Sequence, residues 1–423
     1  MAKKQSWKLD NAALIFPAIQ NGSHNMLFRI SADFVEPIDQ KVLSQALSDV
    51  ADRLPHFRVR LRVGAFWYYF DPNDNDLPLE QDVINPLRRM DFKGQGGYMF
   101  RIRYGSNRIA GEFFHSLCDG TTALTFMRTL WARYLFLLGH TEVLPAPELG
   151  ILDCGDKISE EELEDAFIKY AEKGAKLKRK ESKAWHLTGE RLKDRGLGYV
   201  TLSMDAFALH SKAKELNVTV NEYVTACITE TLYHLQKNTL SKGEIKVSIP
   251  VNMRRYYPTK TLRNFSLYTN VGIDPKCGEY DFPSIAKEIS AMLRYKLQPK
   301  LMSAQMATNV ADEKNVVVRA VPLFIKNIVL STVYLTASES QFTTNYSGLG
   351  VVPLTPEMEK YVTGMCFMLG APRVNTTQVS GLTYKGRFYL TVTEVLRDKS
   401  FRRELAKNFV EKGFEVTVED SGE

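Results

Sequence analysis

One short segment combines residue types that carry out proton transfer. In the stretch His115-Ser116-Leu117-Cys118-Asp119-Gly120, a histidine precedes an Asp-Gly pair by four residues. Because histidine has an ordinary pKa of about 6.5, a large neutral fraction accepts protons near neutral pH. His115 is therefore the candidate general base. Asp119 could orient the imidazole directly, and Gly120 suits a sharp backbone turn close to a substrate.

Cys118 offers a rival chemistry within the same segment. Its thiolate could take up an acyl group before passing it on. Residues three apart in a tight loop seldom present both side chains to one reacting atom, so we favour a structural role for Cys118. The chain has five cysteines without CxxC spacing, which predicts reduced thiols and no metal site.

The sequence places this segment between a strand and a helix. The apolar run Arg108 to Phe114 predicts a strand that ends at the histidine. From Thr121 to Leu138 apolar residues recur at helical spacing, and Gly139 is a plausible end for that helix. A strand-to-helix junction would hold the histidine at the edge of a sheet.

The rest of the chain predicts a mixed α/β (α+β) protein of two domains. We expect domains at 1–180 and 199–423, joined by a charged linker at 181–198. We expect the segment 343–350 to be a polar loop. The expected strands are 25–34, 58–63, 65–70, 98–104, 199–204, 244–251, 329–336, 365–369, 378–384 and 387–395, and the expected helices are 40–53, 205–215, 221–237 and 398–412.

Composition and charge exclude several classes of protein. The net charge of +6 is spread over 104 charged residues, so we expect no nucleic-acid partner. The best candidate for a membrane span, 124–138, contains Arg128 and Arg133 and is too short to cross a bilayer. The first residues lack the pattern of a signal peptide, so we expect a cytoplasmic protein. No GxGxxG or GxxxxGK[ST] motif indicates a nucleotide site.

These motifs resemble a known superfamily. HxxxDG at His115 to Gly120 is similar to the motif of the acyltransferases that include chloramphenicol acetyltransferase, plant acyltransferases and the condensation domains of peptide synthetases. The segment Pro250-Val251-Asn252-Met253-Arg254 resembles the strand end that supplies an arginine in that superfamily. The opening stretch Leu9 to Pro17 looks like the start of bacterial proteins of the alcohol acetyltransferase type.

The resemblance implies a fold and a set of residue roles. It implies two chloramphenicol acetyltransferase-like domains, each a mixed sheet flanked by helices, with the active-site tunnel between them. It makes Asp119 an anchor that pairs with Arg254 instead of a catalytic relay. The segment 343–350 stands where the plant enzymes carry DFGWG, from which it departs. Asn345 and Ser347 are candidate oxyanion donors there, although a plain loop explains them equally well.

The resemblance also implies the reaction. Peptide-synthetase condensation domains usually carry two adjacent histidines, whereas Phe114 precedes His115 here. This difference favours acyl-CoA as co-substrate and a small alcohol or amine as acceptor, without a metal or a covalent intermediate. A carrier-protein-dependent enzyme and a non-catalytic binding protein of the same fold remain alternatives. The basic groups Lys176 to Lys180 and Arg254-Arg255 with Lys260 and Arg263 could meet the phosphates of CoA, although solvated linker charge also explains the first group.

Overall fold

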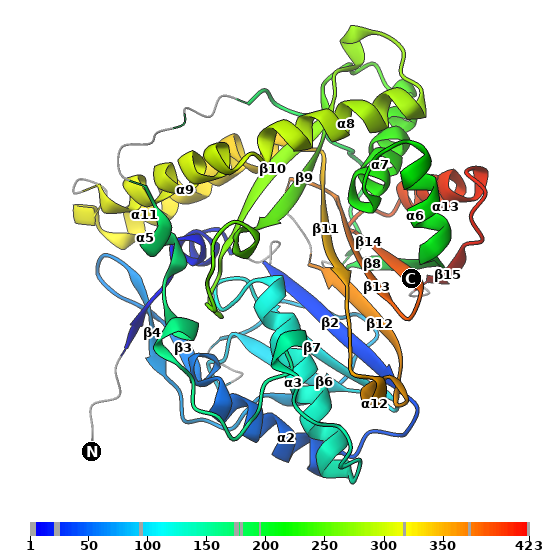
Figure 1. Cartoon of the computed structure of the whole chain (residues 1–423). Helices are drawn as coiled ribbons and strands as arrows, with labels where there is room; N and C mark the ends of the chain where they lie inside the picture. Colours follow the sequence, from blue (N-terminus) through cyan, green and yellow to red (C-terminus); the bar gives the residue numbers. More distant parts are fainter. Residues whose placement is uncertain are drawn as a thin grey trace.

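The computed structural model describes residues 6–20, 26–92, 96–172, 177, 181–193, 196–315, 319–370 and 374–420. Two halves, each built on a large sheet, stack on one another, with the N-terminal half below in Figure 1. The mixed α/β architecture predicted from the sequence is confirmed. Within the described part of the chain, no helix is long and apolar enough to cross a bilayer.

The N-terminal half is built on a five-stranded sheet. Its strands in spatial order are β12 (Val362–Leu369), β2 (Leu27–Phe34), β7 (Arg108–Phe114), β6 (Phe100–Tyr104) and β5 (Leu79–Gln81). The helix α3 (Gly120–Leu138) packs on β2 and β7, and α2 (Gln40–Arg53) packs on α3. Both helices match the predicted ranges closely, because their apolar residues recur at helical spacing.

The C-terminal half is built on a seven-stranded sheet. Its strands in spatial order are β10 (Ser266–Ile273), β9 (Ile245–Asn252), β11 (Thr344–Val351), β13 (Thr377–Tyr384), β14 (Arg387–Glu394), β8 (Gly198–Asp205) and β15 (Thr417–Asp420). Its helices are α6 (Ala206–Glu215), α7 (Val220–Lys237), α8 (Phe282–Lys296) and α13 (Ser400–Glu411). Strand β12 leaves this half and pairs antiparallel with β2, so the N-terminal sheet contains a strand from the C-terminal half of the sequence.

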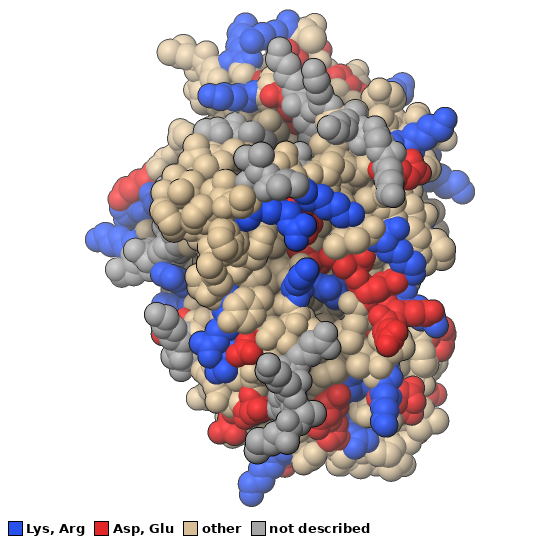
Figure 2. Space-filling view, turned by 90° about the vertical axis from the view of Figure 1, so that its left-hand side faces the viewer, with Lys and Arg blue, Asp and Glu red and all other residues tan. Residues whose placement is uncertain are grey.

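A third, smaller layer covers one side of the molecule. It contains the sheet of β1 (Trp7–Lys8), β4 (Tyr68–Pro72) and β3 (Val59–Val63). Beside it lie α1 (Phe16–Ile19), α9 (Pro299–Lys314) and α11 (Leu323–Ala337). The helices α9 and α11 lie at the left of Figure 1, on the side that faces the viewer in Figure 2.

Two predicted elements are wrong. Residues 329–336, expected as a strand, belong to helix α11. The β-branched residues of that run favour a strand, but a continuous apolar run fits a helix equally well. Residues 343–350, expected as a loop, form most of β11. Gly348 of this strand serves close packing, because a Cβ there would lie 2.9 Å from Asn221 Oδ1.

The helices in the described part of the charged segment between the halves are short. These are α4 (Glu160–Leu163) and α5 (Ala166–Tyr170). The basic group at 176–180 lies outside the described residues apart from Leu177. The described part of the predicted linker runs along the C-terminal half, where Ala184 N donates to Ser340 O. The boundary between the domains stays a prediction.

A fully buried carboxylate sits on the N-terminal sheet. Glu112 of β7 lies 2.6 Å from Arg101 Nη2 and 3.1 Å from Arg29 Nη1, and it accepts from Leu87 N at 3.2 Å. Burial raises its pKa, but the charges of the arginines Arg101, Arg29 and Arg103 outweigh that effect and lower the pKa below its ordinary value. Glu112 therefore stays ionised inside the protein.

Replacing this carboxylate should cost stability. We expect Glu112→Gln to lower the free energy of unfolding by about 3 to 5 kcal/mol at pH 7, because the buried arginines lose their counter-charge. The pKa of Glu112 is lower in the folded than in the unfolded protein. Its contribution to the free energy of unfolding is therefore complete above the pKa of the unfolded state, and it is lost as pH falls through the pKa of the folded state. Urea unfolding at pH 7 and at pH 4 measures both effects. The exposed Glu411→Gln is the control, and an equal loss in both variants would contradict the account.

Candidate active site

The predicted motif forms a tight connection between β7 and α3. His115 N donates to Met26 O at 2.9 Å, which continues the pairing of β7 with β2 beyond the end of the strand. Leu117 N then donates to Phe114 O at 2.8 Å and turns the chain. Helix α3 begins at Gly120, as the sequence predicts within one residue. The histidine thus lies at the end of a central strand.

Asp119 holds the start of α3 and faces the arginine that the resemblance implies. Its Oδ1 caps the helix by accepting from Thr122 N at 3.0 Å. Its Oδ2 lies 2.7 Å from Arg254 Nη1 and accepts from Phe265 N at 2.9 Å. Burial raises the pKa of Asp119, but the charge and hydrogen bonds of Arg254 and the two backbone donors bring it below its ordinary value. Both carboxylate oxygens are therefore engaged away from His115.

Arg254 is held in place from several sides. Its Nε donates to Thr261 O at 3.0 Å, and its Nη2 donates to Arg263 O at 2.6 Å and to Thr122 Oγ1 at 3.1 Å. Asn252, two residues earlier, donates to Thr121 Oγ1 at 3.2 Å. These bonds join the segment after β9 to the first turn of α3. The two halves of the protein meet at the motif.

The imidazole of His115 lies among aromatic rings. Phe16 of α1 stacks on it with ring centroids 4.6 Å apart, and Phe28 of β2 approaches edge-on at 5.3 Å. The side chain is only partly exposed. Burial lowers its pKa below the ordinary 6.5, while the charge of Asp119 and the amide of Asn264 act in the opposite direction. The ring is consequently neutral at neutral pH and can accept a proton.

Asn264 is a residue of this site that the sequence did not reveal. Its Nδ2 donates to Asp10 Oδ2 at 3.2 Å and to Ser116 O at 3.4 Å. Its Oδ1 and the Nδ1 of His115 are both buried, and among the described residues neither has a hydrogen-bond partner. Burial also raises the pKa of Asp10 to about 6. No pattern around Asn264 in the sequence indicates its place in the site.

Phe16 was also missed as a site residue. It lies in the opening segment that carries part of the resemblance, but nothing in that segment indicates contact with His115. The contact arises because α1, which packs on α11, also reaches the end of β7. Long-range packing of this kind leaves no local pattern in a sequence.

Cys118 points into the core. Its side chain is fully buried, and burial together with the charges of Asp119 and Asp10 raises its pKa well above the ordinary value. A thiolate is therefore strongly disfavoured here. The structure supports the structural interpretation of Cys118 over the nucleophilic one.

Gly120 serves packing and not the sharp turn that we expected. Gly120 is the first residue of α3, and its φ lies outside the left-handed region. A Cβ at this position would lie 3.3 Å from Leu349 Cδ2 of β11. The glycine thus lets β11 approach the motif.

The oxyanion candidates lie on the same strand. Asn345 and Ser347 share one face of β11 with Leu349, because side chains alternate along a strand. The Oδ1 of Asn345 is buried, and the described residues provide it with no hydrogen-bond partner. No contact recorded among the described residues joins Asn345 or Ser347 to His115. Their role stays a prediction.

The basic residues near the motif are largely engaged inside the protein. Arg254 contacts Asp119, and Arg263 donates to Lys8 O at 2.6 Å and lies 3.8 Å from Asp10. Lys260 forms an exposed ion pair with Glu161 at 3.1 Å. Arg255 is exposed. Among the described basic residues that we expected to bind the phosphates of CoA, Arg255 and Lys260 are therefore the ones that lie at the surface.

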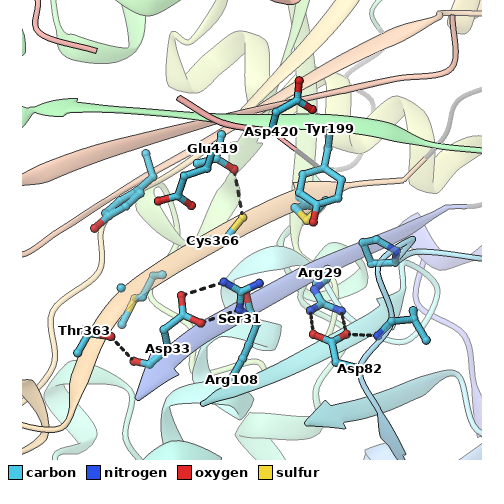
Figure 3. Close-up of a pocket in the computed structure, with 17 residues that line it drawn as sticks. Arg29, Ser31, Asp33, Asp82, Arg108, Tyr199, Thr363, Cys366, Glu419 and Asp420 are labelled. Atoms are coloured by element: carbon cyan, nitrogen blue, oxygen red, sulfur yellow. Dashed lines mark hydrogen bonds and ion pairs between the residues drawn. The ribbon is translucent and has the colours of Figure 1, made fainter. Parts of the chain in front are cut away.

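A polar cavity of about 390 Å³ lies elsewhere between the two large sheets (Figure 3). Arg108, the first residue of β7, lines this cavity. His115 follows the last residue of the same strand and does not line it. Both guanidinium groups that line it are paired, Arg29 with Asp82 and Arg108 with Asp33, each at 2.6 Å. The cavity is thus separate from the motif.

No group of three or more potential metal ligands occurs within the described part of the chain. A neutral imidazole stands at the end of a strand, and an ion pair fixes the turn that follows it.

Comparison with solved structures identifies the fold. Polyketide synthase associated protein 5 from Mycobacterium tuberculosis matches with a TM-score of 0.61 and 16% identity, over 95% of this chain and 96% of its own. TRI101 from F. graminearum, complexed with coenzyme A and T-2 mycotoxin, matches with a TM-score of 0.64 and 12% identity, over 97% and 99%. This chain has the fold of the chloramphenicol acetyltransferase-like acyltransferases. The fold implied by the motifs is confirmed.

Two further neighbours extend the comparison. TRI3 trichothecene 15-O-acetyltransferase from Fusarium sporotrichioides matches with a TM-score of 0.59 and 10% identity, over 96% of this chain and 94% of its own. The nonribosomal peptide synthetase FmoA3 matches with a TM-score of 0.61 and 12% identity, over 96% of this chain and 42% of its own. No family model and no curated protein sequence matches the chain.

Removing the partner of Asp119 should destabilise the protein. We expect Arg254→Met to lower the free energy of unfolding by about 3 to 5 kcal/mol near pH 7, because a buried carboxylate loses its counter-ion. The loss should shrink at acid pH, where Asp119 is protonated. Urea unfolding measures it, with the neighbouring exposed Arg255→Met as control. Unchanged stability in Arg254→Met would contradict the anchoring role.

Proposed function

We propose that this protein is a CoA-dependent acyltransferase that moves an acyl group from a thioester to an alcohol or amine. The observation that carries the proposal is the neutral, partly exposed imidazole of His115 at the end of β7. A turn tied down by Asp119 and Arg254 follows it. Neighbours of the same fold include an acetyltransferase and a protein crystallised with coenzyme A, which supports this donor.

The proposed reaction needs only one proton carrier. The Nε2 atom of His115 takes the proton of the acceptor, and the acceptor oxygen or nitrogen forms a bond to the thioester carbonyl carbon. The carbon–sulfur bond then breaks, and the CoA thiolate takes the proton back from the imidazolium. Proton transfer of this kind contributes roughly 10²- to 10⁴-fold to the rate.

The remaining residues have supporting roles in this proposal. During the reaction Asn264 Oδ1 would accept from Nδ1 of His115, since both atoms are buried and without a partner among the described residues, and this bond would leave Nε2 as the basic atom. Asp119 and Arg254 position the turn and do not transfer protons. Asn345 or Ser347 donates to the oxyanion, and exposed Arg255 meets a phosphate of CoA.

Carrier protein is the second candidate donor. The likeness to FmoA3, a peptide synthetase, favours it, and Phe114, which stands where condensation domains usually carry a second histidine, disfavours it. Comparing free acetyl-CoA with an acetylated pantetheine carrier protein separates the two donors. A higher kcat/KM with the carrier would assign the protein to the carrier-dependent class.

His115→Ala should remove the activity. We expect release of free thiol from acyl-CoA, in the presence of an alcohol and amine panel, to fall by about 10² to 10⁴-fold. The exposed His210→Ala is the control and should keep full activity. Equal thiol release by wild type and His115→Ala with every acceptor would sink the catalytic assignment. No release by wild type with any donor would favour the non-catalytic alternative.

The pH profile reports the state of the base. Because burial lowers the pKa of His115, activity should be retained below the ordinary 6.5 and be lost only at more acid pH. Since Asn264 raises that pKa, Asn264→Ala should move the acid limb of kcat/KM further down in pH and lower kcat. Measuring kcat/KM from pH 4 to pH 8 for both proteins tests this. An acid limb of kcat/KM above pH 7 in wild type would contradict a base whose pKa is lowered by burial.

A further inference from the structure

Asp10 is a buried carboxylate that lies next to the surroundings of the candidate base. It is 1% exposed and belongs to the opening segment of the chain, and the proposed reaction gives it no role. Its Oδ2 accepts from Nδ2 of Asn264 at 3.2 Å and from the backbone N of the same residue at 3.4 Å. Asp10 therefore contacts the side chain that acts on the pKa of His115.

The other oxygen of Asp10 holds the chain that covers the imidazole. Its Oδ1 accepts from Ala13 N at 2.8 Å, and the backbone O of Asp10 accepts from the same nitrogen at 3.1 Å. Three residues after Ala13, Phe16 stacks on the ring of His115. The two oxygens of one carboxylate thus support two sides of the base.

Asp10 is ionised near neutral pH although it is buried. Burial raises its pKa to about 6, and the charge of Asp165 acts in the same direction. The charge of Arg263 and the hydrogen bonds that Asp10 accepts lower the pKa. At pH 7.5 the side chain is therefore mostly a carboxylate, which accepts hydrogen bonds and has none to donate.

The acceptors around Asn264 determine which way its amide points. Its Nδ2 meets Oδ2 of Asp10 and the backbone O of Ser116, and both of these atoms are acceptors only. Turning the amide by 180° would bring its own oxygen against two acceptors and break both bonds. The oxygen Oδ1 therefore points the other way, where it is buried without a partner among the described residues.

The Nδ1 atom of His115 is the matching group for that oxygen. Within the described part of the chain it is likewise buried and without a partner. The side chain of Asn264 raises the pKa of the imidazole, as an acceptor for a ring proton does, and the backbone of His115 acts in the same direction. A neutral imidazole carries one proton, so a proton held on Nδ1 leaves Nε2 free to accept another.

We propose that Asp10 is a positioning residue for the base. It holds the amide of Asn264 in the orientation in which Oδ1 accepts from Nδ1 of His115, and Nε2 is then the nitrogen that takes the proton of the acyl acceptor. Asp10 acts through Asn264. The effect on catalysis rests on the proposed acyltransferase function, whereas the position of the proton on the imidazole does not.

Nitrogen-15 NMR of protein labelled at histidine tests where the proton lies, at pH 7.5 and without substrate. The signals of His115 are those absent from His115→Gln. In wild type we expect the proton of the neutral ring on Nδ1. Asp10→Asn replaces one acceptor oxygen by a donor, so the amide of Asn264 loses its fixed orientation. The two nitrogen shifts of His115 should then move towards each other, as the form with the proton on Nε2 becomes populated.

Kinetics test whether Asp10 acts through Asn264. Asp10→Asn should lower kcat about 10-fold without changing KM for acyl-CoA, because a hydrogen bond to a charged group is lost away from the substrate. The double variant Asp10→Asn/Asn264→Ala should be no slower than Asn264→Ala, because losses along one chain of contacts do not add. The matched control is Asp281→Asn, which removes an exposed carboxylate that caps α8 and should keep the kcat of wild type.

Three results overturn the positioning role. These are a proton on Nε2 in wild type, unchanged nitrogen shifts in a folded Asp10→Asn, and losses of kcat that multiply in the double variant. Thermal unfolding shows whether each variant is folded. If Asp10→Asn does not fold, Asn264→Ala takes its place in the NMR experiment, and unchanged shifts of His115 there overturn the proposal. The spectra need no substrate, so failure of this role and failure of the acyltransferase function are told apart.

Discussion

The ion pair between Asp119 and Arg254 is the constraint on which the candidate site depends. It joins residues 135 apart in sequence and brings the end of β9 against the start of α3. A carboxylate buried this deeply needs a counter-ion, and Arg254 with two backbone donors supplies it. The same carboxylate caps the helix that follows the histidine. One interaction therefore fixes the turn, the helix and the contact between the two halves.

The surroundings of His115 and Cys118 separate two chemistries that their proximity leaves open. Burial disfavours a charged form of both side chains, but with opposite consequences. A neutral imidazole is the form that accepts a proton, whereas a neutral thiol is a poor nucleophile. The same apolar surroundings thus favour general base catalysis by His115 and disfavour covalent catalysis by Cys118. Phe16 and Phe28 supply much of this environment.

The sequence predicted the elements whose formation depends on a local pattern of residues. Apolar periodicity predicted strand β7 and helices α2 and α3. The resemblance implied the arginine after β9. The prediction failed where distant packing decides the structure. The apolar run of α11 fits a strand or a helix, and Gly348 of β11 packs against helix α7. The transfer of β12 to the N-terminal sheet, the contact of Phe16 with His115 and the place of Asn264 are tertiary facts that no spacing encodes.

The central claim is that His115 acts as the general base while the acyl group passes directly from the thioester to the acceptor, and that Cys118 does not carry it. Mass spectrometry tests this most directly, by measuring acylated product from acyl-CoA and mixed acceptors together with the intact mass of the protein. The account predicts product from wild type and Cys118→Ala, strongly reduced product from His115→Ala, and no acyl adduct on the protein. Product lost in Cys118→Ala but kept in His115→Ala, with an acyl adduct on wild type, would contradict it.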